Sequence, residues 1–186
     1  MAKVKVLLNG YTSGDNPGGE EKTRPTVTLV RDGDLVMVVD PGVLENQDIL
    51  IKSLKKEKLT IKQVNTVFLT HSHVDHFVNI GMFPNAQIIE YYGIWKNNIA
   101  KDRSNQLTND IEIIETPGHD STGLSLVVNT DNGKIVICGD IFWKENFPKK
   151  DPYADDPKKL KLSRKKVLKI ADYVIPGHAG MFKVKK

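Results

Sequence analysis

The stretch His71-Ser72-His73-Val74-Asp75-His76 is the part of the sequence that decides the fold. It places three imidazoles and a carboxylate within six residues, and such crowding is costly unless something binds these groups. The stretch follows an apolar strand predicted from Thr66 to Leu69, so we expect His71 and His73 to project together from the turn after that strand. Asp75 and His76 then point toward a neighbouring position. This geometry suits two adjacent metal ions rather than one.

The other two histidines also follow predicted strands, in turns marked by glycine. His119 ends Thr116-Pro117-Gly118-His119, His178 ends Pro176-Gly177-His178, and Asp140 follows Gly139. Taken one at a time, each has an ordinary explanation: a surface histidine patch, a loop or core histidine, or an aspartate that forms a turn or caps a helix. All five histidines of the chain occupy such positions, so these explanations would have to hold together. A metal site is therefore the favoured interpretation.

This order of ligands resembles the metallo-β-lactamase superfamily, and Asp40 in Val38-Val39-Asp40-Pro41-Gly42 matches the first motif of that family. The resemblance implies an α+β fold, the four-layer αββα metallo-β-lactamase sandwich, with metals at one edge. It implies two divalent metal ions, zinc first, with manganese or iron as alternatives. It further implies three sets of ligands and one supporting carboxylate: His71, His73 and His119 for the first ion, Asp75, His76 and His178 for the second, Asp140 as the bridge, and Asp40 beside the site without binding metal.

The activity implied by this resemblance is hydrolysis by a hydroxide that bridges the two metals. Asp75 and Asp140 are the predicted catalytic residues, because they can orient the hydroxide and carry its proton. With every histidine bound to metal, protonation of the leaving group falls to Asp75, to water, or to a lysine or tyrosine of the loops. A narrower resemblance, to a group within the superfamily that is linked to metal-dependent ribonuclease activity, rests on five stretches: Leu8-Asn9-Gly10-Tyr11, Thr26 to Arg31, Gly81-Met82-Phe83-Pro84, Ser163 to Val167, and Ala171-Asp172 running to His178.

The fold does not choose among the substrates that this kind of site can cleave. Phosphodiester cleavage in RNA is the leading hypothesis, favoured by the narrower resemblance and by the lysines after Pro157, although most of these also fit a solvated helix face. A small-molecule thioesterase or lactonase of the glyoxalase II type is the runner-up, with an ester or thioester as its partner. A mononuclear iron persulfide dioxygenase using His71, His119 and Asp140 is a third hypothesis. The complete ligand set disfavours a scaffold without catalysis.

Composition fits a single domain that covers residues 1–186. Hydrophobic residues make up 39% and charged residues 27%, the net charge is +4, and the single Cys138 excludes an intrachain disulfide. No apolar run is long enough to span a membrane, so we expect a cytoplasmic protein without a membrane partner. The oligomeric state is left open.

Four aromatic residues are candidates to line the cleft and stack on bases, with core packing expected for at least half of them: Phe142, Trp143, Phe147 and Tyr153.

Hydrophobic periodicity predicts two helices, Asp48 to Lys58 and Pro157 to Ile170, with Leu50, Ile51 and Leu54 on the inner face of the first. The segment Gly10 to Arg24 is expected to be a long flap, and Tyr91 to Asp110 a compact connection. The strands are short β-branched runs, and the predicted set is Val4 to Leu8, Thr26 to Val30, Leu35 to Val39, Thr66 to Leu69, Gln87 to Glu90, Ile111 to Glu115, Leu124 to Val128, Lys134 to Ile137 and Tyr173 to Ile175.

Overall fold

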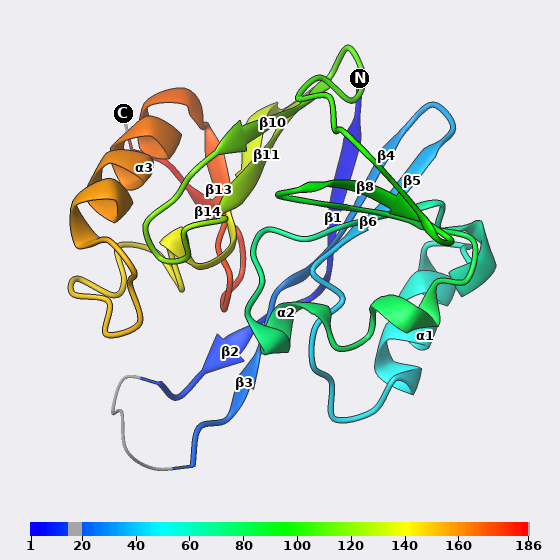
Figure 1. Ribbon diagram of the computed structural model, residues 1–186, viewed down its shortest axis with the longest axis horizontal. Helices are drawn as coiled ribbons and strands as arrows, with labels where there is room; N and C mark the ends of the chain where they lie inside the picture. The colour runs from blue at the N-terminus through cyan, green and yellow to red at the C-terminus, as the bar shows by residue number, and fades with distance from the viewer. Residues whose placement is uncertain (15–19, 186) are drawn as a thin grey trace.

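The computed structural model describes residues 1–14 and 20–185, in which two β-sheets lie face to face between helices (Figure 1). The seven-stranded first sheet runs in the order β1 (Lys3–Leu8), β4 (Val27–Asp32), β5 (Leu35–Val39), β6 (Thr66–Phe68), β7 (Gln87–Glu90), β8 (Gly93–Lys96) and β9 (Ile99–Lys101). The five-stranded second sheet runs in the order β10 (Ile111–Glu115), β11 (Leu124–Thr130), β12 (Gly133–Ile137), β13 (Tyr173–Ile175) and β14 (Phe182–Lys183). The remaining elements are the ribbon of β2 (Tyr11–Thr12) and β3 (Thr23–Arg24), the helices α1 (Asp48–Lys56), α2 (Val74–Phe77) and α3 (Pro157–Ile170), and the 3₁₀ turns η1 (Ile61–Gln63), η2 (Ile80–Met82) and η3 (Gly139–Ile141).

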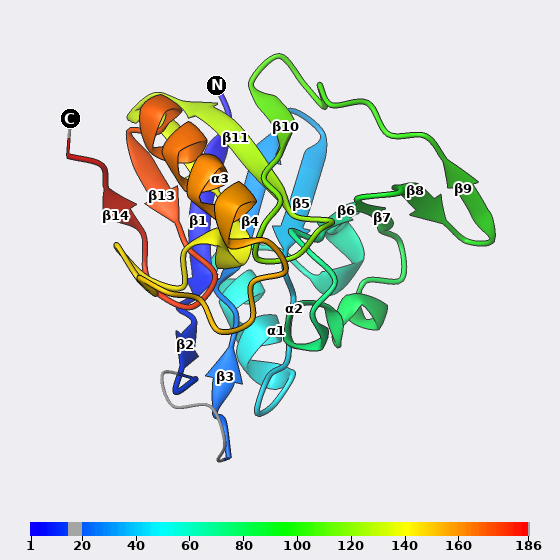
Figure 2. The same ribbon diagram turned by 60° about the vertical axis from the view of Figure 1, so that its left-hand side comes forward.

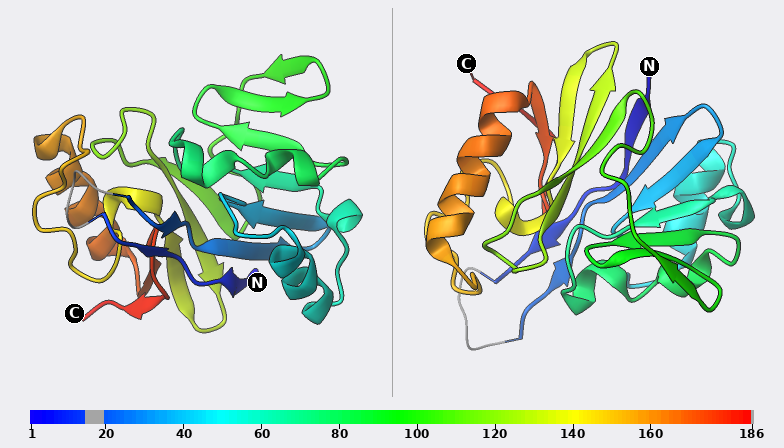
Figure 3. Two further views of the ribbon diagram at one scale, coloured as in Figure 1. Left: turned by 90° about the horizontal axis from the view of Figure 1, so that it is seen from below. Right: turned by 45° about the horizontal axis from the view of Figure 1, so that its top comes forward.

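The alternation of side chains along the strands divides the core into three apolar layers. In β5, Met37 and Val39 pack between the two sheets, whereas Val38 lies in the cluster that packs against α1. In the second sheet, Leu126 faces the first sheet and Val127 packs with the cluster around α3. The order of layers is therefore helix, sheet, sheet, helix, as two further directions of view show (Figures 2 and 3). The predicted α+β fold, the αββα sandwich, is confirmed.

Parallel pairing determines where polar loops collect. β5 pairs with β6 in parallel, and β12 pairs with β13 in parallel. The loops that follow these strands therefore leave from the carboxyl ends of neighbouring strands, and they bring together segments that are far apart in the sequence. Asp40 follows β5, His71 follows β6, Asp140 follows β12 and His178 follows β13.

Two expectations about local structure are corrected, those for Ile51 and for Tyr91 to Asp110, and the expected flap is described only in part. Ile51 is 40% exposed, so the buried stripe of α1 is the narrower pair of Leu50 and Leu54. The segment predicted to be a flap contains the paired strands β2 and β3, while its residues 15–19 lie outside the described residues. The segment expected to be compact instead forms the β8–β9 hairpin, which extends the first sheet away from the core (Figure 2). None of the helices among the described residues has the length and apolar run that crossing a membrane requires.

The narrow buried stripe of α1 gives a test of the packing. Leu54→Ala should lower the free energy of unfolding by about 2–5 kcal/mol, because Leu54 is fully buried and its removal leaves a cavity. Ile51→Ala, on the same helix, should cost less than about 1 kcal/mol because much of that side chain already contacts water. Denaturant unfolding of both variants measures the difference. Equal costs would show that α1 buries a wider face.

Candidate metal centre

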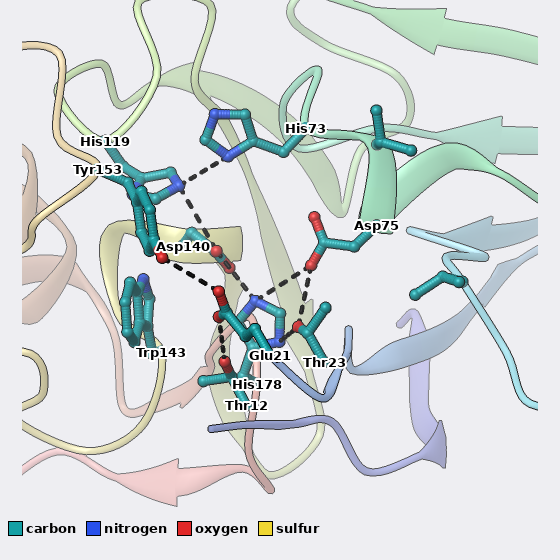
Figure 4. Close-up of a pocket in the computed structure, with 12 residues that line it drawn as sticks. Thr12, Glu21, Thr23, His73, Asp75, His119, Asp140, Trp143, Tyr153 and His178 are labelled. Atoms are coloured by element: carbon teal, nitrogen blue, oxygen red, sulfur yellow. Dashed lines mark hydrogen bonds and ion pairs between the residues drawn. The ribbon is translucent and has the colours of Figure 1, made fainter. Parts of the chain in front are cut away.

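All seven predicted ligands lie in one cluster at the edge of the sandwich. Five of them line a cavity there (Figure 4): His73, Asp75, His119, Asp140 and His178. Their nitrogen and oxygen atoms form three overlapping groups, each with its atoms within 4.8 Å of one another. The groups are His71, His73 and His119; His71, His76 and Asp140; and Asp75, His76 and His178. The first and third groups coincide with the two sets of ligands that the family resemblance implied. Their role as metal ligands stays a prediction.

Hydrogen bonds to the outer ring nitrogens turn the inner nitrogens toward the cavity. Nδ1 of His119 donates to the buried carboxylate of Asp151 at 2.7 Å, and Nδ1 of His178 donates to the carbonyl oxygen of Arg24 at 3.0 Å. Nδ1 of His76 likewise donates to Asp40 at 3.0 Å. In a neutral imidazole the other nitrogen then carries a lone pair. Each of these three rings therefore presents Nε2 as a ready ligand atom.

Asp40 ties two of the histidines to the end of β5. One of its oxygens accepts from the backbone N–H of Thr70 at 2.8 Å, and the other accepts from the Thr70 hydroxyl at 2.7 Å. The same hydroxyl lies 3.0 Å from Nδ1 of His71, so the carboxylate orients His76 directly and His71 through Thr70. Asp40 has a positive φ of 48°, a conformation that an aspartate adopts at some cost in strain. The structure thus places it beside the histidines rather than among the converging atoms.

Asp140 lies between the two outer groups of ligands. Its carboxylate oxygens are 3.5 Å from His119 Nε2, 3.3 Å from His76 Nε2 and 3.0 Å from His178 Nε2. Gly177 makes room for it, because a Cβ at that residue would lie 1.7 Å from a carboxylate oxygen of Asp140. A carboxylate in this position can reach the ligand atoms on both sides.

Three buried polar atoms in the cluster lack a hydrogen-bond partner among the described residues: Nε2 of His71, Nε2 of His76 and Oδ1 of Asp140. A buried polar group without a partner is costly, by about 1–3 kcal/mol for each neutral group. Two of these atoms carry lone pairs in the neutral rings and the third belongs to a carboxylate, so a cation satisfies all three while a water satisfies only some. Imidazole and carboxylate are also the ligands that zinc and similar divalent ions accept. The side chains therefore fit divalent metal ions.

Neighbouring charges and burial shift the pKa values of three side chains in the cluster, His71, His76 and Asp140. Burial, followed by the neighbouring His76, holds the pKa of His71 well below its ordinary value. Burial also opposes a charge on His76, but the carboxylates of Asp140 and Asp40 overcome it and raise the His76 pKa well above the ordinary value. The pKa of Asp140 lies well below its usual range, because the attraction of His178 and His76 outweighs burial.

Two supporting residues were missed by the sequence reasoning. Asp151 is buried and orients His119, and Thr23 donates to Asp75 at 3.2 Å while lying 3.3 Å from His178 Nδ1. Asp151 follows two lysines and precedes a proline in a loop, so nothing in its surroundings marks it as part of a site. Both residues hold predicted ligands in place across more than thirty positions of sequence, with Asp151 separated from His119 by 32 and Thr23 from Asp75 by 52.

The cavity in front of the cluster has a volume of about 550 Å³. Trp143 and Tyr153 form one wall, with their rings stacked at a centroid distance of 5.9 Å. Tyr153 also donates from its hydroxyl to Glu21 at 3.1 Å, which connects this wall with the segment that carries Thr23 (Figure 4). Phe142 belongs instead to the apolar cluster around α3. Core packing was expected for at least half of the four aromatic residues, and Phe142 is the one that packs in this cluster.

Fold and site together define a metal-dependent hydrolase of the αββα type, and comparisons with known proteins agree. Residues 22–101 match the metallo-β-lactamase superfamily. Metallo-β-lactamase domain-containing protein 1 of Xenopus laevis is 35% identical, in a match that covers 98% of this chain and 82% of the relative. A probable metallo-hydrolase of Methanocaldococcus jannaschii is 31% identical, in a match that covers 96% of this chain and 87% of the relative. The chain thus belongs to the metallo-β-lactamase superfamily. The narrower resemblance predicted from the sequence is to metallo-β-lactamase domain-containing protein 1, and this resemblance is confirmed as well. A crystal structure of a candidate metallo-β-lactamase from Thermotoga maritima has the same fold, with a TM-score of 0.76. The two chains are 22% identical in sequence, and the match covers 98% of this chain and 99% of the other.

The contact between Asp151 and His119 predicts a role in metal affinity. Asp151→Asn should weaken metal binding by about 10–100-fold, because it removes the negative charge that fixes the His119 tautomer. Competition with a chromophoric chelator measures the change. Asp102→Asn, an exposed aspartate in the loop after β9, is the matched control and should leave the affinity unchanged. If both variants bound metal like the unaltered protein, Asp151 would have no orienting role.

The raised pKa of His76 predicts that metal binding releases a proton. The carboxylates of Asp140 and Asp40 favour the protonated form of His76, and a proton on Nε2 must leave before that nitrogen can act as a ligand. Apparent metal affinity should therefore fall as the pH is lowered, and proton release should diminish only above the raised pKa. Titration calorimetry at pH 7 in two buffers of different ionisation enthalpy counts the protons. Identical heats in both buffers would contradict the prediction.

Proposed function

We propose that this protein is a dinuclear metal-dependent hydrolase that cleaves phosphodiester bonds in RNA. The observation that supports this substrate is the stacked pair of Trp143 and Tyr153, which walls the cavity directly beside the ligand cluster. Aromatic faces of this kind hold nucleic-acid bases by stacking, at about 1–3 kcal/mol per base. Tyr153 is 43% exposed and offers a free ring face to a ligand.

The charge of the cluster also favours an anionic substrate. Five of the seven predicted ligands are imidazoles, which bind metal in the neutral form, and only Asp75 and Asp140 bring negative charge. Two divalent ions in this set of ligands would leave a net charge of about +2 at the centre. A phosphodiester is drawn to such a site more strongly than a neutral ester.

The side chains of the cavity have distinct parts in this proposal. Bound divalent ions supply Lewis acidity and lower the pKa of water to about 7. Asp75 accepts from Thr23 through Oδ2 and is partly exposed, so it can take up a proton at the mouth of the cavity. Tyr153 keeps its phenolic proton because the hydrogen bond to Glu21 raises its pKa, and it lies on the wall where a leaving group would depart.

A small-molecule thioesterase or lactonase is the second candidate function. It is favoured by the apolar part of the cavity lining, to which Val43 and the 65% exposed Val74 contribute together with Trp143. A cavity of about 550 Å³ is also large enough to bury a small acyl group. This candidate shares the metal centre and differs in the substrate alone.

Metal content and a panel of substrates separate the candidates. Elemental mass spectrometry gives the ions per chain, and assays on single-stranded RNA, a thioester and a lactone give the activity. Two zinc or manganese ions with RNA cleavage would support the proposal. Two ions with turnover of the thioester or lactone alone would replace it with the second candidate, and a single iron would indicate the persulfide dioxygenase.

Asp75→Asn tests the role of the carboxylate at the mouth. We expect hydrolysis to fall by about 10²–10⁴-fold, because proton transfer through this group is lost. Asp75 is partly exposed, so the metal-free variant should keep the circular dichroism spectrum and the melting temperature of the metal-free unaltered protein. Asp102→Asn serves again as the control with the same change of charge. Full activity in the Asp75 variant would exclude the two-metal mechanism in this form.

A further inference from the structure

A second cavity opens beside the metal centre. It has a volume of about 560 Å³ and is lined mainly by the loop that follows η3: Trp143, Asn146, Phe147, Pro148, Lys149 and Lys150. Trp143 lines the metal-centre cavity as well, so the two cavities meet at this indole. Trp143 is therefore a wall that the second cavity shares with the cavity of the predicted metal ligands.

The chemistry of the second cavity differs from that of the first. Lys149 and Lys150 are exposed, and none of the described residues that line this cavity is acidic. Phe147 packs edge-on against Trp143 at a centroid distance of 5.9 Å, and the ammonium of Lys144 lies over one face of its ring at 4.1 Å from the centroid. The same cavity is therefore lined by aromatic rings and by lysines. Adjacent aromatic and cationic groups are what a nucleotide requires, one for its base and the other for its phosphate.

The loop that forms the second cavity is held in shape by a hydrogen bond within its own backbone and by Arg164 of α3. The N–H of Trp143 donates to the carbonyl oxygen of Phe147 at 2.9 Å, and the guanidinium of Arg164 donates to the carbonyl oxygen of Pro148 at 2.8 Å. The next residue after the lysines is Asp151, which orients His119. The same short loop therefore fixes both a predicted metal ligand and the two lysines, and it keeps them at a set separation.

Trp143 carries a further sign of a ligand at this junction. Its side chain is 97% buried by neighbours, since only 3% is exposed, and its Nε1 has no hydrogen-bond partner among residues 1–14 and 20–185. A buried N–H without an acceptor is costly. An oxygen of a ligand that lies along the shared wall would supply that acceptor.

We propose that this second cavity is a subsite for the nucleotide adjoining the scissile bond, with its phosphate on Lys149 and Lys150 and its base against Phe147 and Trp143. This subsite rests on the proposed function, because it assigns the bond at the metal centre to a phosphodiester. It makes the substrate a chain of at least two nucleotides rather than a single small ester.

The test compares two double variants of equal charge. Lys149→Ala with Lys150→Ala removes the subsite lysines, and Lys52→Ala with Lys56→Ala removes two exposed lysines of α1, in the helix layer on the far side of the sandwich. The metal-loaded enzymes are assayed on a short RNA oligonucleotide and on bis(p-nitrophenyl) phosphate, which fills the metal-centre cavity alone. Binding of a phosphorothioate oligonucleotide is measured in parallel by fluorescence anisotropy over a range of salt.

The subsite variant should lose kcat/KM on the oligonucleotide and keep its activity on the small phosphodiester. For this variant the slope of log K against log salt should be shallower by about 1.4. This is the change expected when two contacts to phosphates of a single strand are lost. The α1 variant should match the unaltered enzyme in every assay. Equal effects in both variants, or equal losses on both substrates, would overturn the subsite.

Two further outcomes separate the subsite from the proposed function. If the unaltered enzyme cleaves RNA and the subsite variant cleaves and binds it equally well, the subsite fails and the function stands. If the enzyme binds the oligonucleotide through these lysines without cleaving any phosphodiester, the function fails and the subsite stands. Hydrolysis of an acyl-coenzyme A thioester with the same dependence on Lys149 and Lys150 would reassign the cavity to the phosphates of a small molecule.

Discussion

The arrangement of this protein depends on a set of buried lone pairs that face one another. Nε2 of His71, Nε2 of His76 and Oδ1 of Asp140 have no hydrogen-bond partner among the described residues, and they lie within the same cluster. Side chains rarely adopt such positions without compensation, because each one gives up its contact with water. The surrounding polar contacts keep the rings from turning away to find partners elsewhere. The cluster is therefore prepared for a cation by the protein itself, through the groups that hold the outer ring nitrogens.

Those outer contacts come from different layers of the sandwich. Asp40 at the end of β5 holds His76 and, through Thr70, His71, whereas Asp151 from the loop before α3 holds His119. The backbone carbonyl of Arg24, the last residue of β3, holds His178. These four histidines are thus supported by residues distant in sequence. A change far from the cavity can alter the site by moving one of these supports.

The sequence predicted the fold and the converging side chains because both leave local signals. The stretch His71 to His76 carries four potential ligands in six positions, and the short β-branched strands alternate clearly enough to be located. Asp151 was missed because its role depends on a contact with His119 that only the folded chain creates. The β8–β9 hairpin was missed for a different reason, since β9 is wholly exposed and β8 buries only Gly93 and part of Ile94, which leaves no apolar alternation to detect. Ile51 was misplaced because it sits at the border of the buried stripe, one position from Leu50.

The converging side chains come from both sheets, and this has a consequence for the mechanics of the molecule. His71 and His76 follow a strand of the first sheet, while Asp140 and His178 follow strands of the second. A bound cation would therefore act as a reversible cross-link that closes the loop between His71 and His178 and fastens one sheet to the other. At a free ion concentration of 100 times its dissociation constant, such a link adds about 2.7 kcal/mol to the stability of the folded chain. The supply of metal in its surroundings would then set the lifetime of the protein as well as its activity.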